Sequence, residues 1–359
     1  MFTWSENPSQ DMWNHLSFLG SSSNCKRLLN GEINPKRSVL YENGPELEKK
    51  ANQIAMCINQ GREYFYAAQK VSINTSPLLY FYGMLSLAKS LIVSNNRDLF
   101  LEDIEYHGLT ARPNSEYLKK YKRDSSKWEI EKEFAVTKGG VFKHLSTILN
   151  DYAFEDDSIF RFKDVISICP ELSAFFKKYY KEDSKLMDLY SISSKKDPTF
   201  KLELALQGLD ENVAYTHFPE LITDFVLDPE ILHKQARKFS SKNLTEFPSY
   251  FRVQHGIVGG RYLVEGIKFF YASNTMKRCI HEATADYLAM FILSNCVRYK
   301  QDFWNEIIRG QKSGVLGLIE IYISIIKRRY PNFILESLFE ERFIYGTPAH
   351  IEGKLLNFF

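Results

Sequence analysis

Apolar residues recur with a helical period between residues 46 and 70, and charged residues fill the positions between them. This pattern predicts an amphipathic helix. The next segment, SPLLYFYGMLSLAKSLI from residue 76 to residue 92, is almost wholly apolar. It predicts a second helix that runs to about Ser94, with Ser76 as its cap and Pro77 in its first turn. The apolar positions of the first helix are Leu47, Ala51, Ile54, Ile58, Phe65 and Ala68.

The polar link VSINTS between these two predicted helices is short. Helices joined by a short link pack antiparallel, so we expect a helical hairpin in which the apolar faces around Tyr64 and Tyr82 meet. This hairpin is the expected nucleus of a helical bundle.

The middle of the chain carries patterns typical of strands. The segment IEKEFAV (130–136) alternates in part, TKGG after it indicates a turn, and VFKHLSTIL returns to a helical period. In TFKLELAL (199–206), every second residue from Phe200 to Leu206 is apolar, which predicts a strand with one buried face. In residues 250–267, apolar and polar residues interleave on both sides of a glycine-containing turn, which predicts a β-hairpin.

The last third returns to helical patterns. We expect one helix over residues 281–299, a second in FWNEIIRG with Asp302 as its cap, and a third in GVLGLIEIYISIIKRRYP that ends at Pro331. The fold class is therefore α+β, mainly helical, with a small antiparallel β insertion.

The expected organisation is one compact unit. It consists of an N-terminal extension (1–45), a helical segment (46–125), a mixed segment with antiparallel strands (126–270) and a C-terminal helical segment (271–359) that packs on the first.

The charge balance is nearly neutral, with 46 Lys and Arg against 44 Asp and Glu, so the whole chain lacks the strong positive field of a dedicated nucleic-acid binder. Local basic patches are compatible with this near-neutral charge balance. In YLKKYKRDSSKW (117–128), basic residues alternate with aromatic ones, and such runs bind phosphates and stack bases. The alternative is a solvated helix face above an aromatic core. The candidate nucleic-acid-binding residues are Lys119, Lys120, Lys122 and Arg123.

The five cysteines are scattered, without a CxxC pair or zinc-like spacing to histidine, so we expect reduced thiols and no metal or other cofactor. The N-terminus lacks the regions of a signal peptide. In the apolar run after residue 76, Pro77, Gly83 and Lys89 favour a core helix over a membrane span. A soluble, cytoplasmic protein is expected.

Two charged residues stand out against apolar surroundings. Lys89 either extends its ammonium to water or is a polar member of the core, hydrogen-bonded near His107 or to Glu63. Arg298 follows the apolar segment YLAMFILSNCV, and it either pairs with a carboxylate such as Asp302 or faces a phosphate in a cleft.

Four stretches together resemble the bacterial YaaC-like proteins. They are SPLLYFYGMLSLAKSLI, EYHGLT (105–110), GGVFKHL (139–145) and LSNCVRYKQDFW (293–304), and they span the chain from Thr75 to Trp304. The resemblance implies an architecture rather than an established activity.

The segment from Leu47 to Leu109 also resembles, more loosely, HEPN domains, which are helical bundles that often act as RNases in toxin–antitoxin and antiphage systems. The similarity lies in the aromatic helix that contains Lys89 and in the pair His107 and Gly108. Active HEPN RNases carry an arginine followed at a set spacing by a histidine. No histidine of this chain stands at that spacing, which argues against a canonical HEPN nuclease.

Two hypotheses follow. The first is a HEPN-like binding or scaffold component for RNA, a nucleotide or a protein partner encoded nearby, in antiphage defence or stress response, with an oligomer allowed and no membrane contact. The alternative is a metal-independent RNase. In that case His107 or His281 is the general acid or base, and Arg298 and Lys89 stabilise the charge on the phosphorane.

Overall fold

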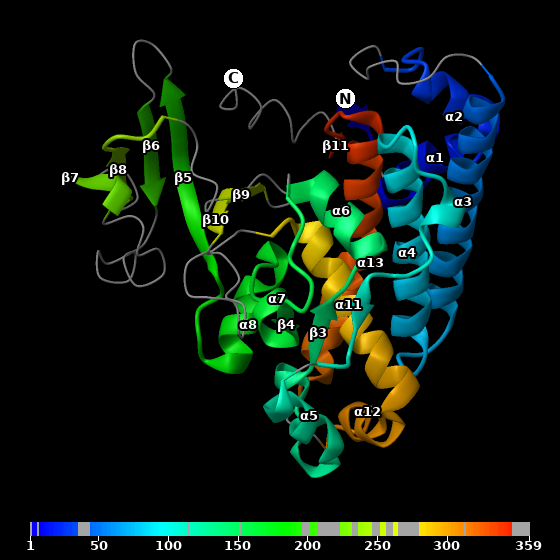
Figure 1. Ribbon diagram of the computed structural model, residues 1–359. Coiled ribbons are helices and arrows are strands. Elements are labelled where there is room, and N and C mark those ends of the chain that lie inside the picture. The colour runs from blue at the N-terminus through cyan, green and yellow to red at the C-terminus, as the bar shows by residue number, and fades with distance from the viewer. Residues whose placement is uncertain are drawn as a thin grey trace.

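The computed structural model places a helical body beside a six-stranded sheet (Figure 1). It describes residues 2–5, 7–34, 44–113, 115–150, 152–195, 201–206, 223–231, 236–245, 252–255, 261–264, 280–311 and 314–346.

The helical body is built from eleven α-helices within these described ranges. They are α1 (Pro8–Phe18), α2 (Ser22–Leu29), α3 (Pro45–Lys70), α4 (Ser76–Asn95), α5 (Glu116–Arg123), α6 (Val141–Asn150), α7 (Phe162–Ile166), α8 (Ser173–Tyr180), α11 (Glu282–Tyr299), α12 (Gln301–Ile308) and α13 (Leu316–Phe339). Short 3-10 turns lie at Leu101–Asp103, Ser125–Lys127, Ile130–Lys132 and Pro170–Leu172.

The strands form three separate sheets. A parallel pair joins the two ends of the described chain, a three-stranded antiparallel sheet has the order β2-β3-β4, and a six-stranded antiparallel sheet has the order β7-β8-β6-β5-β10-β9. The strands are β1 (Phe2–Trp4), β2 (Leu109–Thr110), β3 (Phe134–Thr137), β4 (Ile159–Arg161), β5 (Leu186–Lys195), β6 (Lys201–Leu206), β7 (Phe225–Ile231), β8 (Arg237–Ser241), β9 (Arg252–His255), β10 (Arg261–Val264) and β11 (Ile344–Gly346).

The predicted helical hairpin is confirmed in α3 and α4. The rings of Tyr64 and Tyr82 stack with their centroids 5.7 Å apart. The helices approach closely because each presents a glycine to the other: a Cβ on Gly83 would lie 2.6 Å from the Phe65 ring, and one on Gly61 would lie 2.8 Å from Leu87. These contacts leave no room for a methyl group.

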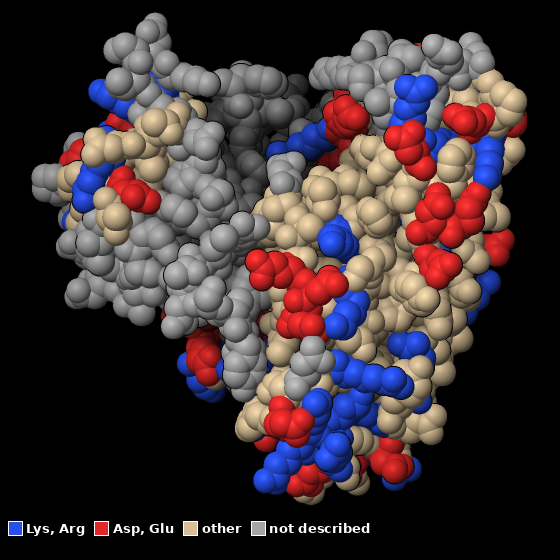
Figure 2. Space-filling model, in the orientation of Figure 1, with Lys and Arg blue, Asp and Glu red and all other residues tan. Residues whose placement is uncertain are grey.

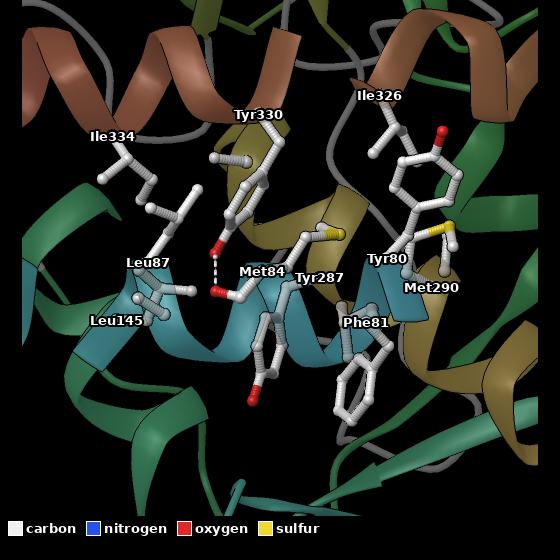
Figure 3. Close-up of a cluster of buried hydrophobic side chains, with 14 of the residues drawn as sticks. Tyr80, Phe81, Met84, Leu87, Leu145, Tyr287, Met290, Ile326, Tyr330 and Ile334 are labelled. Carbon is white, nitrogen blue, oxygen red and sulfur yellow. Dashed lines mark hydrogen bonds between the residues drawn. The ribbon is translucent and has the colours of Figure 1, made fainter. Parts of the chain in front are cut away.

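Helix α4 lies at the centre of the body (Figure 3). Tyr330 of α13 donates a hydrogen bond to the Met84 carbonyl at 3.2 Å, and Tyr287 of α11 packs against Phe81. Among the described helices, α4 is the one long and apolar enough to cross a membrane, but 72% of its apolar window is buried inside the protein. That burial is typical of a core helix, as the sequence predicted.

Three predicted helix boundaries are wrong. Ser76 is the first residue of α4, and Thr75 is at the cap position. Helix α13 does not end at Pro331 but continues to Phe339. Proline removes one backbone hydrogen bond, and here burial of the next two turns outweighs that cost, because Ile334, Leu335 and Leu338 are fully buried. Helix α12 begins at Gln301, so Asp302 lies in its first turn and is not its cap.

The strand predictions are confirmed in β3, β6, β9 and β10, except that Ile130–Lys132 of the predicted segment IEKEFAV forms a 3-10 turn before β3. In β6, Leu202, Leu204 and Leu206 are fully buried, whereas Phe200 lies outside the described residues. Strands β9 and β10 pair antiparallel, and the turn between them also lies outside. The mainly helical α+β class is confirmed, while the segment boundaries and the HEPN-like arrangement stay predictions.

Candidate functional site

His107 lies where the chain enters β2, on the side of the helical body. Its ring packs against Phe81 of α4 and Phe291 of α11, with centroids 6.0 and 5.3 Å away. Its carbonyl accepts a hydrogen bond from the Tyr287 hydroxyl at 3.0 Å. Next to it, Gly108 has φ +80°, and a Cβ there would meet backbone atoms of α6, so this turn requires glycine.

The His107 ring is held in its neutral form. Burial lowers its pKa from the usual 6.5, and the positive charge of Arg298 lowers it further. Its Nδ1 accepts a hydrogen bond from the Leu109 amide at 3.2 Å, so the proton of the neutral ring is on Nε2. In this state the imidazole has one donor to offer and no free acceptor.

Arg298 lies in the last turn of α11, two turns after Phe291 and on the same helix face. Its Nε donates to the Ser294 carbonyl at 3.3 Å, so the side chain folds back along the helix in the direction of His107. The guanidinium stands 5.0 Å from the centre of the Tyr299 ring. Within the described part of the chain it pairs with no carboxylate, Asp302 included.

Exposed aromatic side chains accompany this pair. Tyr299, which follows Arg298, is 69% exposed, and Tyr106, which precedes His107, is 71% exposed. Most of the large aromatic residues that the structure describes are in the core, so the exposed Tyr299 ring against the half-buried Arg298 guanidinium is a distinctive local feature.

His281 is not part of this arrangement. It precedes the first turn of α11 and caps it, with Nδ1 accepting from the Ala283 amide at 3.0 Å and its ring against Phe333. Arg298 is in the last turn of the same helix, whose 18 residues span about 27 Å. The two side chains therefore cannot reach one phosphate.

Lys89 also lies apart from Arg298. It is two turns beyond Phe81 along α4, and α11 runs the opposite way and ends where α4 begins (Figure 1). Lys89 is half-buried near Cys57, whose thiol pKa burial raises to about 12. Among the described residues it forms no hydrogen bond or ion pair with His107 or Glu63. The structure thus brings together two of the four predicted catalytic residues.

The basic residues of α5 divide into two pairs. Lys120 and Arg123 are exposed, and neither forms an ion pair with a described residue. Lys119 pairs with Glu116 at 2.7 Å, and Lys122 donates to the Ala111 carbonyl at 2.9 Å.

Figure 2 shows Lys and Arg side chains gathered at the lower end of the visible face, around α5, with acidic residues among them. The pKa of Lys122 is lowered by burial and by the positive charges of Lys300 and Arg112. The end of α11 and the segment after β2 therefore belong to the same neighbourhood as α5.

A buried ion pair that sequence reasoning missed fixes this neighbourhood. The Lys300 ammonium contacts both carboxylate oxygens of Glu133 at 2.7 Å and stands 4.1 Å from the centre of the Trp128 ring. Tyr121 of α5 donates to the same carboxylate at 3.0 Å. Lys300 is the residue after Tyr299, so the pair holds the end of α11, α5 and β3 together around the site.

A second buried cluster was also missed. Arg329 of α13 binds Asp286 of α11 and Glu171, and Tyr322 donates to Asp286 at 2.8 Å. Asp286 and Arg329 are almost fully buried, so this cluster joins helices rather than facing a ligand. No local sequence pattern indicates the Lys300–Glu133 pair or the Arg329–Asp286 pair, because the partners of each are far apart in the sequence.

The described residues contain no candidate metal site and no reactive thiol. No group of three or more His, Cys, Asp or Glu there is placed to hold a metal ion. The four cysteines within the described ranges are free and buried, and burial raises the thiol pKa of each, which suppresses the reactive thiolate. Cys279 lies outside the described residues.

Comparisons with known proteins give one result at the level of the family. The family model described as YaaC-like Protein matches residues 17–338, most of the chain. No curated protein and no solved structure matches.

Proposed function

This chain belongs to the YaaC-like family, whose description carries no activity, and from its site we propose that it is a non-catalytic RNA-binding component. The observation that carries the proposal is Arg298: its half-buried guanidinium stands 5.0 Å from the centre of the exposed Tyr299 ring, and no described carboxylate neutralises it. We call Arg298, His107, Tyr106 and Tyr299 the Arg298 site.

A phosphate is the ligand that such a guanidinium suits. Among the described residues, Arg298 forms one hydrogen bond, a long one from Nε to its own helix, so its two terminal nitrogens are available there. Arginine binds phosphate oxygens through two parallel hydrogen bonds. Partial burial weakens the competition from water and strengthens this contact.

The aromatic rings favour RNA over inorganic phosphate. Tyr106 and Tyr299 have exposed faces on which unpaired bases can stack, and each such contact contributes about 1–3 kcal/mol. The Nε2 hydrogen of His107 adds one donor for a phosphate or base oxygen.

Basic residues beyond the site extend the proposed contact. The chain runs from His107 through β2 to the exposed Arg112, at most about 17 Å of extended backbone. Arg112 lies near Lys122 of α5, whose exposed neighbours are Lys120 and Arg123. These cations can neutralise successive phosphates of one strand.

The hydrogen bond to the His107 ring is the reason to prefer binding over cleavage. A general base must accept a proton, yet its Nδ1 is occupied by the Leu109 amide and its Nε2 already carries hydrogen. The RNase alternative keeps one supporting observation, the proximity of His107 and Arg298. We also propose a role in antiphage defence or stress response, which is supported by the resemblance to HEPN domains alone.

The direct test is equilibrium binding of a fluorescent single-stranded RNA, followed by anisotropy. We expect Arg298→Ala to weaken binding about 10- to 100-fold, which corresponds to one lost charged hydrogen-bonding contact. Arg27→Ala is the matched control, because Arg27 is half-exposed in α2 and pairs with Glu32; its affinity should equal that of the wild type.

Incubation of the same RNA with the wild type, followed by mapping of its ends, separates the two functions. Intact RNA supports the binding proposal. Discrete cuts that are lost in both His107→Ala and Arg298→Ala would contradict the binding proposal and support the RNase alternative.

A further inference from the structure

A small pocket is lined in part by Trp128, whose ring also contacts the buried Lys300 ammonium. Its walls are Trp128, Ile130, Phe303, Ile307 and Val315, with Glu129 and Glu131 at its polar part. The rings of Trp128 and Phe303 meet edge to face, 6.0 Å apart, so the apolar wall is firmly built. The Arg298 site and this pocket share no residue.

The polar groups of the pocket are negative or neutral. Glu129 forms an ion pair with Lys132 at 2.8 Å, but Glu131 forms none within the described residues. The positive charges of two lysines act to lower the pKa of Glu131, but each lysine is paired with another carboxylate. Lys132 pairs with Glu129, and Lys163 pairs with Glu182. Among the residues that the structure describes, no basic side chain lines the pocket.

The Glu131 carboxyl, which lines this pocket, therefore has an unmet requirement for positive charge. Burial raises the pKa of Glu131, which means that its carboxylate lacks full compensation in the free protein.

We infer that this pocket binds a small organic cation, a primary ammonium carried on a short apolar or aromatic group. The apolar group would pack against the wall formed by Trp128 and Phe303, and the ammonium would pair with Glu131. The cavity volume is about 240 Å³. It lies below the range of about 300–1,000 Å³ for drug-sized ligands, so a single ring with a short side chain is the appropriate size.

The test uses 2-phenylethylamine as the probe, with binding to the full-length protein followed by calorimetry. The neutral 2-phenylethanol and the anionic 3-phenylpropionate have similar size and report the contribution of charge. We expect saturable binding of the amine, at least about tenfold tighter than either comparison compound, because only the amine forms a charged hydrogen bond.

Two variants locate the site. Glu131→Gln keeps the shape of the side chain and should lower amine affinity about tenfold, whereas Glu129→Gln, which changes a carboxylate already paired with Lys132, should leave it unchanged. Three results would each overturn the inference. They are equal affinity for the amine and the alcohol, binding that does not saturate at millimolar amine, and an amine affinity in Glu131→Gln equal to that of the wild type. RNA affinity is measured separately, so failure here leaves the Arg298 site untouched.

Discussion

The Lys300 ammonium lies 2.7 Å from each carboxylate oxygen of Glu133, and the side chains are only 5% and 4% exposed. This pair joins the end of α11 to the segment before β3, and Tyr121 adds α5 through its hydroxyl. The Arg298 site is therefore built on a fixed junction of three segments rather than on an isolated helix end.

Removal of the cation from this junction should be strongly destabilising. Lys300→Met leaves Glu133 buried without its partner, so we expect the free energy of unfolding to fall by about 3–5 kcal/mol in urea denaturation. The double variant Lys300→Met/Glu133→Leu should recover most of the loss, because no buried charge remains. Lys132→Met, which breaks the exposed pair with Glu129, should cost less than about 1 kcal/mol. Similar losses for both lysine variants would contradict this account.

The helical hairpin should be sensitive to a single methyl group. In Gly83→Ala the new Cβ would lie 2.6 Å from the Phe65 ring, so we expect a loss of about 1–3 kcal/mol from overpacking. Gly317→Ala is the matched control, because Gly317 is also helical and a Cβ there meets nothing within 4 Å. It should be neutral or stabilising by about 0.5–1 kcal/mol. Thermal unfolding of the two variants measures the contrast, and a stabilising Gly83→Ala would refute the close approach.

The pH dependence of stability should carry a signature of His107. The folded-state pKa is below the unfolded value of 6.5, so the unfolded chain binds more protons between these two values. The contribution of neutral His107 to the free energy of unfolding is therefore complete above pH 6.5, and it is lost as the pH falls towards the folded-state pKa.

His107→Asn isolates this effect, because an asparagine oxygen can accept the Leu109 amide hydrogen and does not titrate. The other histidines titrate in both proteins and cancel. The stability of the wild type relative to the variant should therefore decline as the pH is lowered through 6.5. A constant or rising difference would mean that the His107 pKa is not lowered.

Stacking at the Arg298 site predicts different results for two substitutions of Tyr299. Tyr299→Ala removes the ring and should weaken RNA binding by about 1–3 kcal/mol. Tyr299→Phe keeps the aromatic face and should bind RNA about as tightly as the wild type. Anisotropy titrations give both values, and equal affinities for all three proteins would exclude a stacked base on this ring.

The sequence was sufficient to predict the helices and strands with strong periodicity. The pairing of Tyr64 with Tyr82 followed from two apolar patterns and a short link. The end of α13 was mispredicted because the local rule for Pro331 was outweighed by buried leucine and isoleucine contacts from elsewhere in the chain.

The candidate site was predictable only in part. Arg298 and His107 stood out as polar residues beside apolar or family-like segments, but nothing local indicated that they approach each other while His281 and Lys89 do not. The partners Lys300 and Glu133 lie 167 residues apart in the sequence, and their contact is set by tertiary packing that periodicity does not encode.

The salt dependence of RNA affinity tests the central proposal most directly. If Arg298 neutralises a phosphate, the logarithm of the association constant should fall linearly with the logarithm of salt concentration. Arg298→Ala should reduce that slope by about 0.7, the value for one phosphate on a single strand, and Arg27→Ala should leave it unchanged. A slope near zero in the wild type, or an identical slope in Arg298→Ala, would contradict RNA binding at the Arg298 site.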